Sequence, residues 1–287
     1  MGGKVLATRR QVLAAVAGAG GLAMPALAYS RPLVLALTPV LMTSDLDLLG
    51  LLRSYLSEAL DLPVQLATRR SYQDVTVLVL GGKVDAAWVC GYPYVMHRDL
   101  LEVLAVPLWR GAPTYESYLI VESGALVREW RDLAGQMHAF SDPDSNSGYL
   151  VTAALLARHG QRVESFFRGT MFTYEHRNVV RAVASGLAQS GSVDGYIWEV
   201  MAEVEPELAG ATRVLRRSEP LGFPPVVVNP ALADDGRSAA LREALLSMAA
   251  DDAGRTLLAE LHLDGFVGVP DSHFDTIAAQ AALLRQP

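Results

Sequence analysis

The sequence alternates between short apolar runs of strand length and longer amphipathic stretches of helix length. Residues 33–40 (LVLALTPV), 64–68 (VQLAT) and 84–90 (VDAAWVC) are three such runs, and residues 48–60 carry leucines at helical spacing. Chains in which buried strands alternate with helices fold into sheets that are covered by helices on both faces. The alternation therefore predicts an α/β protein.

The same alternation continues to the end of the chain, and two breaks in it suggest a division into two lobes. The later strand candidates are residues 101–109, 115–122, 137–141, 169–174, 192–198, 212–216 and 226–229, and the helix candidates are residues 147–159, 176–188 and most of 237–285. Proline-containing breaks near residues 110–115 and 213–222 are suitable places for the chain to leave one lobe and return to it. We expect residues 29–112 and 218–287 to form one lobe and residues 113–217 to form the other.

The N-terminus has the pattern of an export signal. Lys4 and the pair Arg9-Arg10 precede a short apolar stretch, and Ala26-Leu27-Ala28 fits the small-x-small site that signal peptidase cleaves. The adjacent arginines are typical of a twin-arginine signal. The sequence thus predicts a leader over residues 1–28 and a soluble periplasmic protein.

Composition excludes one class of partner and leaves the single cysteine open to two interpretations. The chain has 24 basic and 31 acidic residues, and this acidic balance without a basic run argues against nucleic-acid binding. Cys90 has no second cysteine with which to form an intrachain disulfide. It is either an inert buried side chain or a reactive group, and it lies at the carboxyl end of an expected strand, where ligands of open α/β sheets bind.

The stretch SDPDSNSG, residues 141–148, is the most informative local motif. Ser145, Asn146 and Ser147 precede an expected helix, and three small polar residues exceed what capping alone requires. Their side chains and the free backbone N–H groups of a helix start can together hold a small oxyanion.

The motif DPDSNSGYL resembles the DP-x-S-T-S-G-[YF]-L motif of periplasmic binding proteins for phosphonates and related oxyanions. The resemblance continues in order through SYQDV, GGKVDAAW, YESYLIV, EHRNVVRAVASG, SVDGY and EPLGFPPVVV, so it covers essentially all of the chain after the leader. It implies a type II periplasmic binding protein fold, in which two lobes with mixed sheets and flanking helices are joined by two hinge strands. It also implies a monomer without cofactor or catalysis that captures a small oxyanion or oxyacid between the lobes and presents it to an ABC permease.

The resemblance assigns ligand contacts to positions that match the family motifs. The expected contacts are Tyr72, Tyr115, Ser145, Asn146, Ser147, His176 and Asp194. Asn146 stands where the family usually has threonine, so it offers an amide in place of a hydroxyl.

Cys90 departs from the phosphonate-binding pattern, because a thiol is a weak hydrogen-bond donor and a thiolate repels an anion. The segment WVCGYPY is similar to the arsenite-sensing branch of the same superfamily, in which a cysteine takes arsenite and the protein signals to a membrane sensor kinase. Two ligand classes therefore remain open: phosphonate, phosphite or phosphate with Cys90 uninvolved, and arsenite or a similar thiophile bound by Cys90. A more remote alternative is an enzyme that uses Cys90, His176 and Asp194 as a nucleophilic site.

Overall fold

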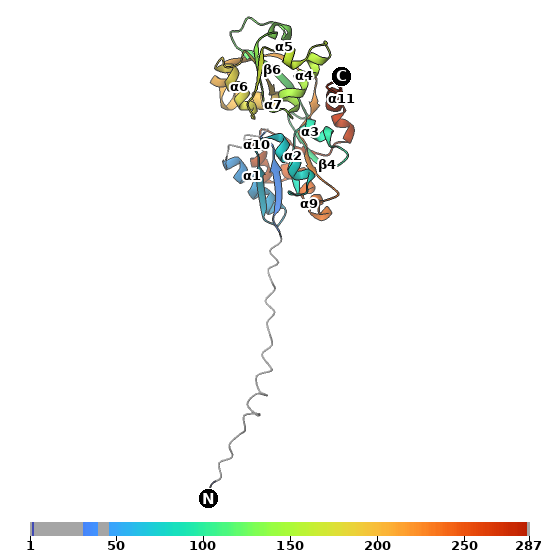
Figure 1. Ribbon diagram of the computed structural model, residues 1–287. Coiled ribbons are helices and arrows are strands. Elements are labelled where there is room, and N and C mark those ends of the chain that lie inside the picture. The colour runs from blue at the N-terminus through green and yellow to red at the C-terminus, as the bar shows by residue number, and fades with distance from the viewer. Residues whose placement is uncertain (1, 3–30, 40–45, 286–287) are drawn as a thin grey trace. The chain divides into compact units, whose positions relative to one another are not determined.

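Two mixed sheets, each with its own helices, organise the computed structural model (Figure 1), which describes residues 2, 31–39 and 46–285. The first sheet has the strand order β13-β4-β12-β3-β1-β2 and the second the order β10-β6-β9-β7-β8. Both sheets combine parallel and antiparallel pairs. The predicted α/β fold with mixed sheets and flanking helices is confirmed. The expected leader lies outside the described residues.

The first sheet draws its strands from two distant parts of the chain. Its strands are β1 (Leu33–Leu37), β2 (Val64–Thr68), β3 (Ala86–Trp88), β4 (Glu102–Leu108), β12 (Val226–Val228) and β13 (Gly265–Val267). The helices of these segments are α1 (Leu46–Ala59), α2 (Tyr72–Leu80), α3 (Gly91–Met96), α9 (Asp235–Leu246), α10 (Asp252–Glu260) and α11 (Asp275–Leu283), with short 3-10 turns at Met248–Ala250 and Asp271–Phe274. Helix α2 packs on β1 and β3, and α9 packs on β4 and β13. The central strands β3 and β12 are fully buried.

The second sheet is formed by one continuous segment. Its strands are β6 (Ser117–Glu122), β7 (Met137–Phe140), β8 (Gly169–Phe172), β9 (Ser190–Asp194) and β10 (Thr212–Arg217). Its helical elements are a 3-10 turn at Trp130–Leu133, a π-helical turn at Asn146–Leu150, α4 (Val151–Ala157), α5 (Val163–Phe166), α6 (His176–Ala184), α7 (Gly195–Val204) and α8 (Pro206–Gly210). Helix α6 lies on β6, β7 and β9 through a valine-rich face, while its arginines stand on the other side.

The chain passes between the sheets twice, and the two passages pair with each other. Strand β5 (Thr114–Tyr115) and strand β11 (Leu221–Gly222) form a small antiparallel sheet, with Leu221 opposite Tyr115. Helix α11 adds a further link, because it packs on α3 beside the first sheet and on α4 beside the second. The lobe boundaries at residues 112/113 and 217/218 stay a prediction. The two passages, from β4 to β6 and from β10 to β12, are consistent with them.

One predicted strand was wrong in its second half. The apolar run at residues 192–198 predicts a strand, but β9 ends at Asp194 and α7 begins at Gly195. The Asp194 carboxylate accepts hydrogen bonds from the backbone N–H groups of Tyr196 at 2.9 Å and Ile197 at 3.4 Å. This N-cap satisfies donors that an extended strand would have left unpaired, so it favours helix over the β propensity of the run.

Gly191 allows α6 to approach the centre of the second sheet. A Cβ at this position would lie 2.5 Å from Cγ1 of Val179 and 3.3 Å from the Ala139 carbonyl oxygen. We expect Gly191→Ala to lower the free energy of unfolding by about 1–3 kcal/mol, because overpacking forces side chains and backbone to shift. Urea unfolding followed by circular dichroism measures the change.

The matched control is Gly50→Ala in α1, where a Cβ would meet nothing within 4 Å. Replacing glycine by alanine there improves helix propensity, so the control should be neutral or stabilising by up to about 1 kcal/mol. Equal effects of the two substitutions would contradict the packing argument.

Candidate functional site

The SDPDSNSG segment links β7 to α4 through a turn built from its own side chains. The Ser145 hydroxyl accepts a hydrogen bond from the Gly148 backbone N–H at 3.0 Å and caps the π-helical turn. Gly148 is required, since a Cβ there would lie 1.8 Å from Oγ of Ser141. The expected helix at residues 147–159 therefore starts as a wide π turn, a variant often found at functional sites.

Cys90 lies at the end of β3, at the N-cap of α3, and its sulfur faces the turn. Its Sγ accepts a hydrogen bond from the backbone N–H of Asn146 at 3.2 Å. Burial raises the pKa of the thiol to about 12, which outweighs the opposing hydrogen bonds from the backbone of Asn146 and Tyr92. Cys90 is therefore a neutral thiol at physiological pH. It forms a small buried cluster with Tyr72.

Two buried tyrosines approach the turn from the first lobe and from the crossing strand. Tyr72 is the first residue of α2, and its backbone N–H donates to Oδ2 of Asp142 at 3.2 Å. Tyr115 lies in β5, and its hydroxyl accepts from the side-chain amide of Asn146 at 2.8 Å. Burial raises the pKa of both phenols well above the ordinary value, so both are neutral donors.

His176 opens α6, and its partners determine its tautomer. The Asp194 backbone N–H donates to Nδ1 at 3.1 Å, so the proton of the neutral ring lies on Nε2. Nε2 is 3.2 Å from the hydroxyl of Tyr72. Burial lowers the pKa of the imidazole to about 3, and His176 is therefore uncharged at neutral pH.

Asp194 is the last residue of β9, and its two carboxylate oxygens have different contacts. Its Oδ1 caps α7, while Oδ2 is 3.5 Å from the hydroxyl of Ser147. Burial raises the pKa of this carboxyl to about 7, although the backbone of Ile197 and Tyr196 and the Ser147 hydroxyl oppose the shift. Asp194 can therefore change its protonation near neutral pH.

The structure brings all eight expected residues into one buried cluster. Each of them is at most 2% exposed. One connected path of contacts runs from Tyr72 through His176 and Asp194 to Ser147, and another from Cys90 through Asn146 to Tyr115. The contacts Tyr72–His176 and Cys90–Asn146 join residues that belong to the segments of the first sheet to residues that belong to the segment of the second sheet. The segments of the two sheets therefore meet at a shared set of buried polar groups.

The cluster does not have the geometry of a cysteine hydrolase. Within residues 31–39 and 46–285, His176 bonds to Tyr72 and to the Asp194 backbone, with no hydrogen bond to Cys90. A nucleophilic cysteine needs a lowered pKa and an adjacent base, whereas the pKa of Cys90 is raised.

Several polar residues that support the cluster were not predicted as site residues. Asp142 receives the first N–H of α2 from the other lobe, and the Ser117 hydroxyl donates to the Ser147 carbonyl at 2.6 Å. Behind the turn, His138 bonds to Ser190 and Ser192, and burial lowers the pKa of its ring to about 3. Asp142 belongs to the quoted motif, so the sequence offered a signal for it. The others depend on strand pairing that a single sequence does not reveal.

Comparison with known proteins decides the family. The family model of the periplasmic substrate-binding proteins of phosphonate ABC transporters matches residues 36–274. The chain belongs to this family. The resemblance inferred from the sequence is thereby confirmed at family level. A member of this family is a periplasmic substrate-binding protein by its description, and no described helix is long and apolar enough to cross a membrane.

Solved structures share the fold of this phosphonate-family protein. A binding-protein component of an ABC phosphonate transporter from Pseudomonas aeruginosa matches with a TM-score of 0.81 and 21% identity, covering 88% of this chain and 86% of that chain. PhnD1 from Prochlorococcus marinus, solved with methylphosphonate, matches with a TM-score of 0.80 and 17% identity, covering 90% and 99%. A histidine kinase sensor domain matches with a TM-score of 0.57 and 14% identity, covering 84% and 99%.

The raised pKa of Asp194 predicts a pH-dependent cost to the fold of this family member. Because the folded-state pKa of about 7 exceeds the unfolded value, the native state binds more protons between about pH 4 and pH 7. The resulting stabilisation is complete below about pH 4 and is lost as pH rises to 7. We expect Asp194→Asn, which keeps the capping oxygen, to gain stability relative to wild type by about 2–4 kcal/mol over this range.

Urea unfolding of both proteins between about pH 4 and pH 8 tests this expectation. The informative quantity is the difference in free energy of unfolding, because other titrating groups cancel in it. A difference that stays constant with pH would show that Asp194 titrates at its ordinary pKa.

Proposed function

We propose that this protein captures a small, singly charged or neutral oxyacid of the phosphonate and phosphite type between its lobes. In this proposal the eight clustered residues hold the ligand, and the closed protein presents it to an ABC permease. The observation that carries the proposal is that these residues come from both lobes and from the crossing strand and contact one another in one buried cluster. A ligand in that place would hold the lobes together. We further propose that the protein is exported by its twin-arginine leader and acts as a monomer.

The charge of the cluster supports an oxyacid of low charge. The cluster contains no arginine or lysine, its histidine is neutral, and its one carboxyl has a pKa near 7. The Oδ1 atom of Asn146 is buried without a hydrogen-bond partner, so it favours a ligand that brings an O–H group. A dianion would offer only acceptors and would meet the Asp194 carboxylate, whereas a protonated oxyacid can donate to both oxygens.

The pH dependence of binding tests the role of Asp194. We expect the affinity for methylphosphonate to fall as pH rises through about 7, because Asp194 then carries a charge that repels the ligand. The fall should approach about tenfold per pH unit above the pKa. Isothermal titration calorimetry from about pH 5.5 to pH 8.5 measures it.

The control is Asp194→Asn, whose binding curve keeps only the ionisation of the ligand itself. Wild-type and variant affinities that change in parallel with pH across the range would show that the ionisation of Asp194 does not affect ligand binding. If wild type does not bind methylphosphonate at any pH in this range, the result contradicts the proposed function itself.

A second candidate ligand is arsenite, with a sensor kinase as the membrane partner. The observation that favours it is the position of Cys90, whose sulfur faces the backbone of the SNSG turn inside the cluster. A soft sulfur suits a thiophilic centre. A neutral trihydroxide would condense with the thiol, forming an S–As bond while the thiol proton leaves with one hydroxide as water. Such a ligand needs no cationic partner.

A ligand series separates the two candidates. The thermal midpoint of wild type and of Cys90→Ser is measured with methylphosphonate, phosphite and arsenite. A ligand at 100 times its dissociation constant should stabilise by about 2.7 kcal/mol. For the phosphonate candidate we expect stabilisation by the phosphorus compounds that survives Cys90→Ser.

For the arsenite candidate we expect stabilisation by arsenite that disappears in Cys90→Ser. Arsenite binding of equal strength in the variant would exclude Cys90 as its ligand. Stabilisation by none of the three compounds would contradict both candidates.

A further inference from the structure

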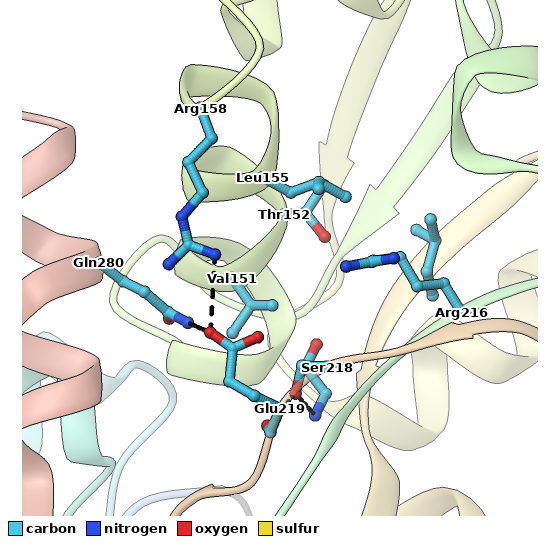
Figure 2. A pocket seen from close by; sticks show the side chains of 10 residues that line it. Val151, Thr152, Leu155, Arg158, Arg216, Ser218, Glu219 and Gln280 are labelled. Carbon is cyan, nitrogen blue, oxygen red and sulfur yellow. Dashed lines mark hydrogen bonds and ion pairs between the residues drawn. The ribbon is translucent and has the colours of Figure 1, made fainter.

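A polar cavity lies beside the second sheet, outside the eight clustered residues (Figure 2). Its walls come from β6, α4, the segment that follows β10, and α11. The empty space is about 370 Å³, including its open mouth. Only a small part of this space is enclosed, so the cavity suits a small ion better than an extended molecule.

Two arginines give the cavity a net positive charge. Arg158 is 3.7 Å from Glu219, and the Gln280 side-chain amide donates to the same Glu219 oxygen at 2.9 Å. Arg216 stands on the opposite wall, and Figure 2 shows its guanidinium directed toward the space beside Thr152. With two guanidinium groups against one carboxylate, one positive charge is left over.

The Arg216 guanidinium has no close protein partner. Within residues 31–39 and 46–285 it makes neither a hydrogen bond nor an ion pair shorter than 4 Å. Its positive charge nevertheless acts on the carboxylate of Glu219. Burial raises the pKa of Glu219, but its hydrogen bonds and the charges of Arg158 and Arg216 outweigh burial and place that pKa below its usual value. The field in the cavity is therefore one that attracts anions.

Gln280 supplies an independent sign of a polar site. The residue is 1% exposed, and its Oε1 atom has no hydrogen-bond partner. The amide cannot be turned over, because its oxygen would then face the Glu219 carboxylate. A buried acceptor without a partner needs a hydrogen-bond donor, so it points to an ordered water at the cavity wall, and such a water can in turn donate to a bound anion.

We propose that this cavity is a second binding site, which holds a small tetrahedral oxyanion between the guanidinium groups of Arg158 and Arg216. Arginine suits this task because its planar fork of N–H groups matches two oxygens of such an ion. The hydroxyl groups of Thr152 and Ser218 line the same space and can add further contacts. The proposal does not depend on which ligand the main site takes.

The position of the cavity couples it to the main site. The Ser117 hydroxyl, in the cavity wall, donates to the Ser147 carbonyl of the ligand turn at 2.6 Å. Helix α4, which carries Arg158 at its C-terminal end, continues directly from that turn. An anion held here ties α4 to the segment that crosses between the lobes, so it favours one arrangement of the lobes. By linkage, the factor by which the anion changes the affinity of the main site for its ligand equals the factor by which that ligand changes the affinity of the cavity for the anion.

Sulfate is the probe that tests the site. Calorimetric titration of the full chain at constant ionic strength is carried out on wild type, Arg216→Gln and the control Arg168→Gln. Arg168 is another exposed arginine of the same lobe, outside the cavity lining. We expect saturable binding that weakens at least about tenfold in Arg216→Gln, since a charge-assisted pair is lost, and is unchanged in Arg168→Gln.

Two further measurements locate the bound sulfate. Ser147→Ala removes a hydroxyl of the main site but leaves the carbonyl that accepts from Ser117, so sulfate binding should persist in it. Sulfate binding abolished by Ser147→Ala, or weakened equally by both arginine variants, would overturn the proposal, as would the absence of saturation in wild type. Failure of methylphosphonate to bind would contradict the proposed function and leave the sulfate result standing.

Discussion

The whole arrangement depends on polar groups that the two lobes bury against each other. Water cannot reach them, so a donor or acceptor that is left unpaired costs about 1–3 kcal/mol. Asp142 accepts from the start of α2, and Cys90 accepts from the turn that follows Asp142. The contact between the lobes is therefore specified by hydrogen-bond geometry as well as by apolar packing. Small shifts of one lobe would break several of these bonds together.

The site cluster contains no basic side chains, whereas arginines are frequent elsewhere in the protein. Arginine carries nearly all of the positive charge of the chain, and several arginines pair with acids at or near the surface. Glu199 on α7, for example, bonds to Arg110 before β5 and to Arg217 at the end of β10. Such half-exposed pairs contribute little stability individually. Their distribution keeps the interior of the interlobe contact free of fixed positive charge.

The sequence predicted the elements better than it predicted the contacts. Strand β2 has the predicted bounds, because a short apolar run between turn residues has few alternatives. The run at residues 192–198 was misjudged, because one capping carboxylate outweighed the β propensity of Val193, Tyr196, Ile197 and Trp198. The eight site residues could be chosen only through the ordered family motifs, since each alone fits an ordinary structural role. The support from Ser117, His138 and Ser192 depends on register between β6, β7 and β9, which local sequence does not encode.

The place of β12 in the first sheet has a consequence for how the chain folds. This strand lies between β3 and β4, yet more than one hundred residues separate it from β4 along the sequence. The first sheet therefore cannot close its centre until most of the chain has been synthesised, whereas the second sheet uses one continuous segment. Long-range pairings form slowly because the intervening loop must first be closed. The second lobe is thus the natural first folding unit, and the edges of β3 and β4 stay open to wrong partners until β12 arrives.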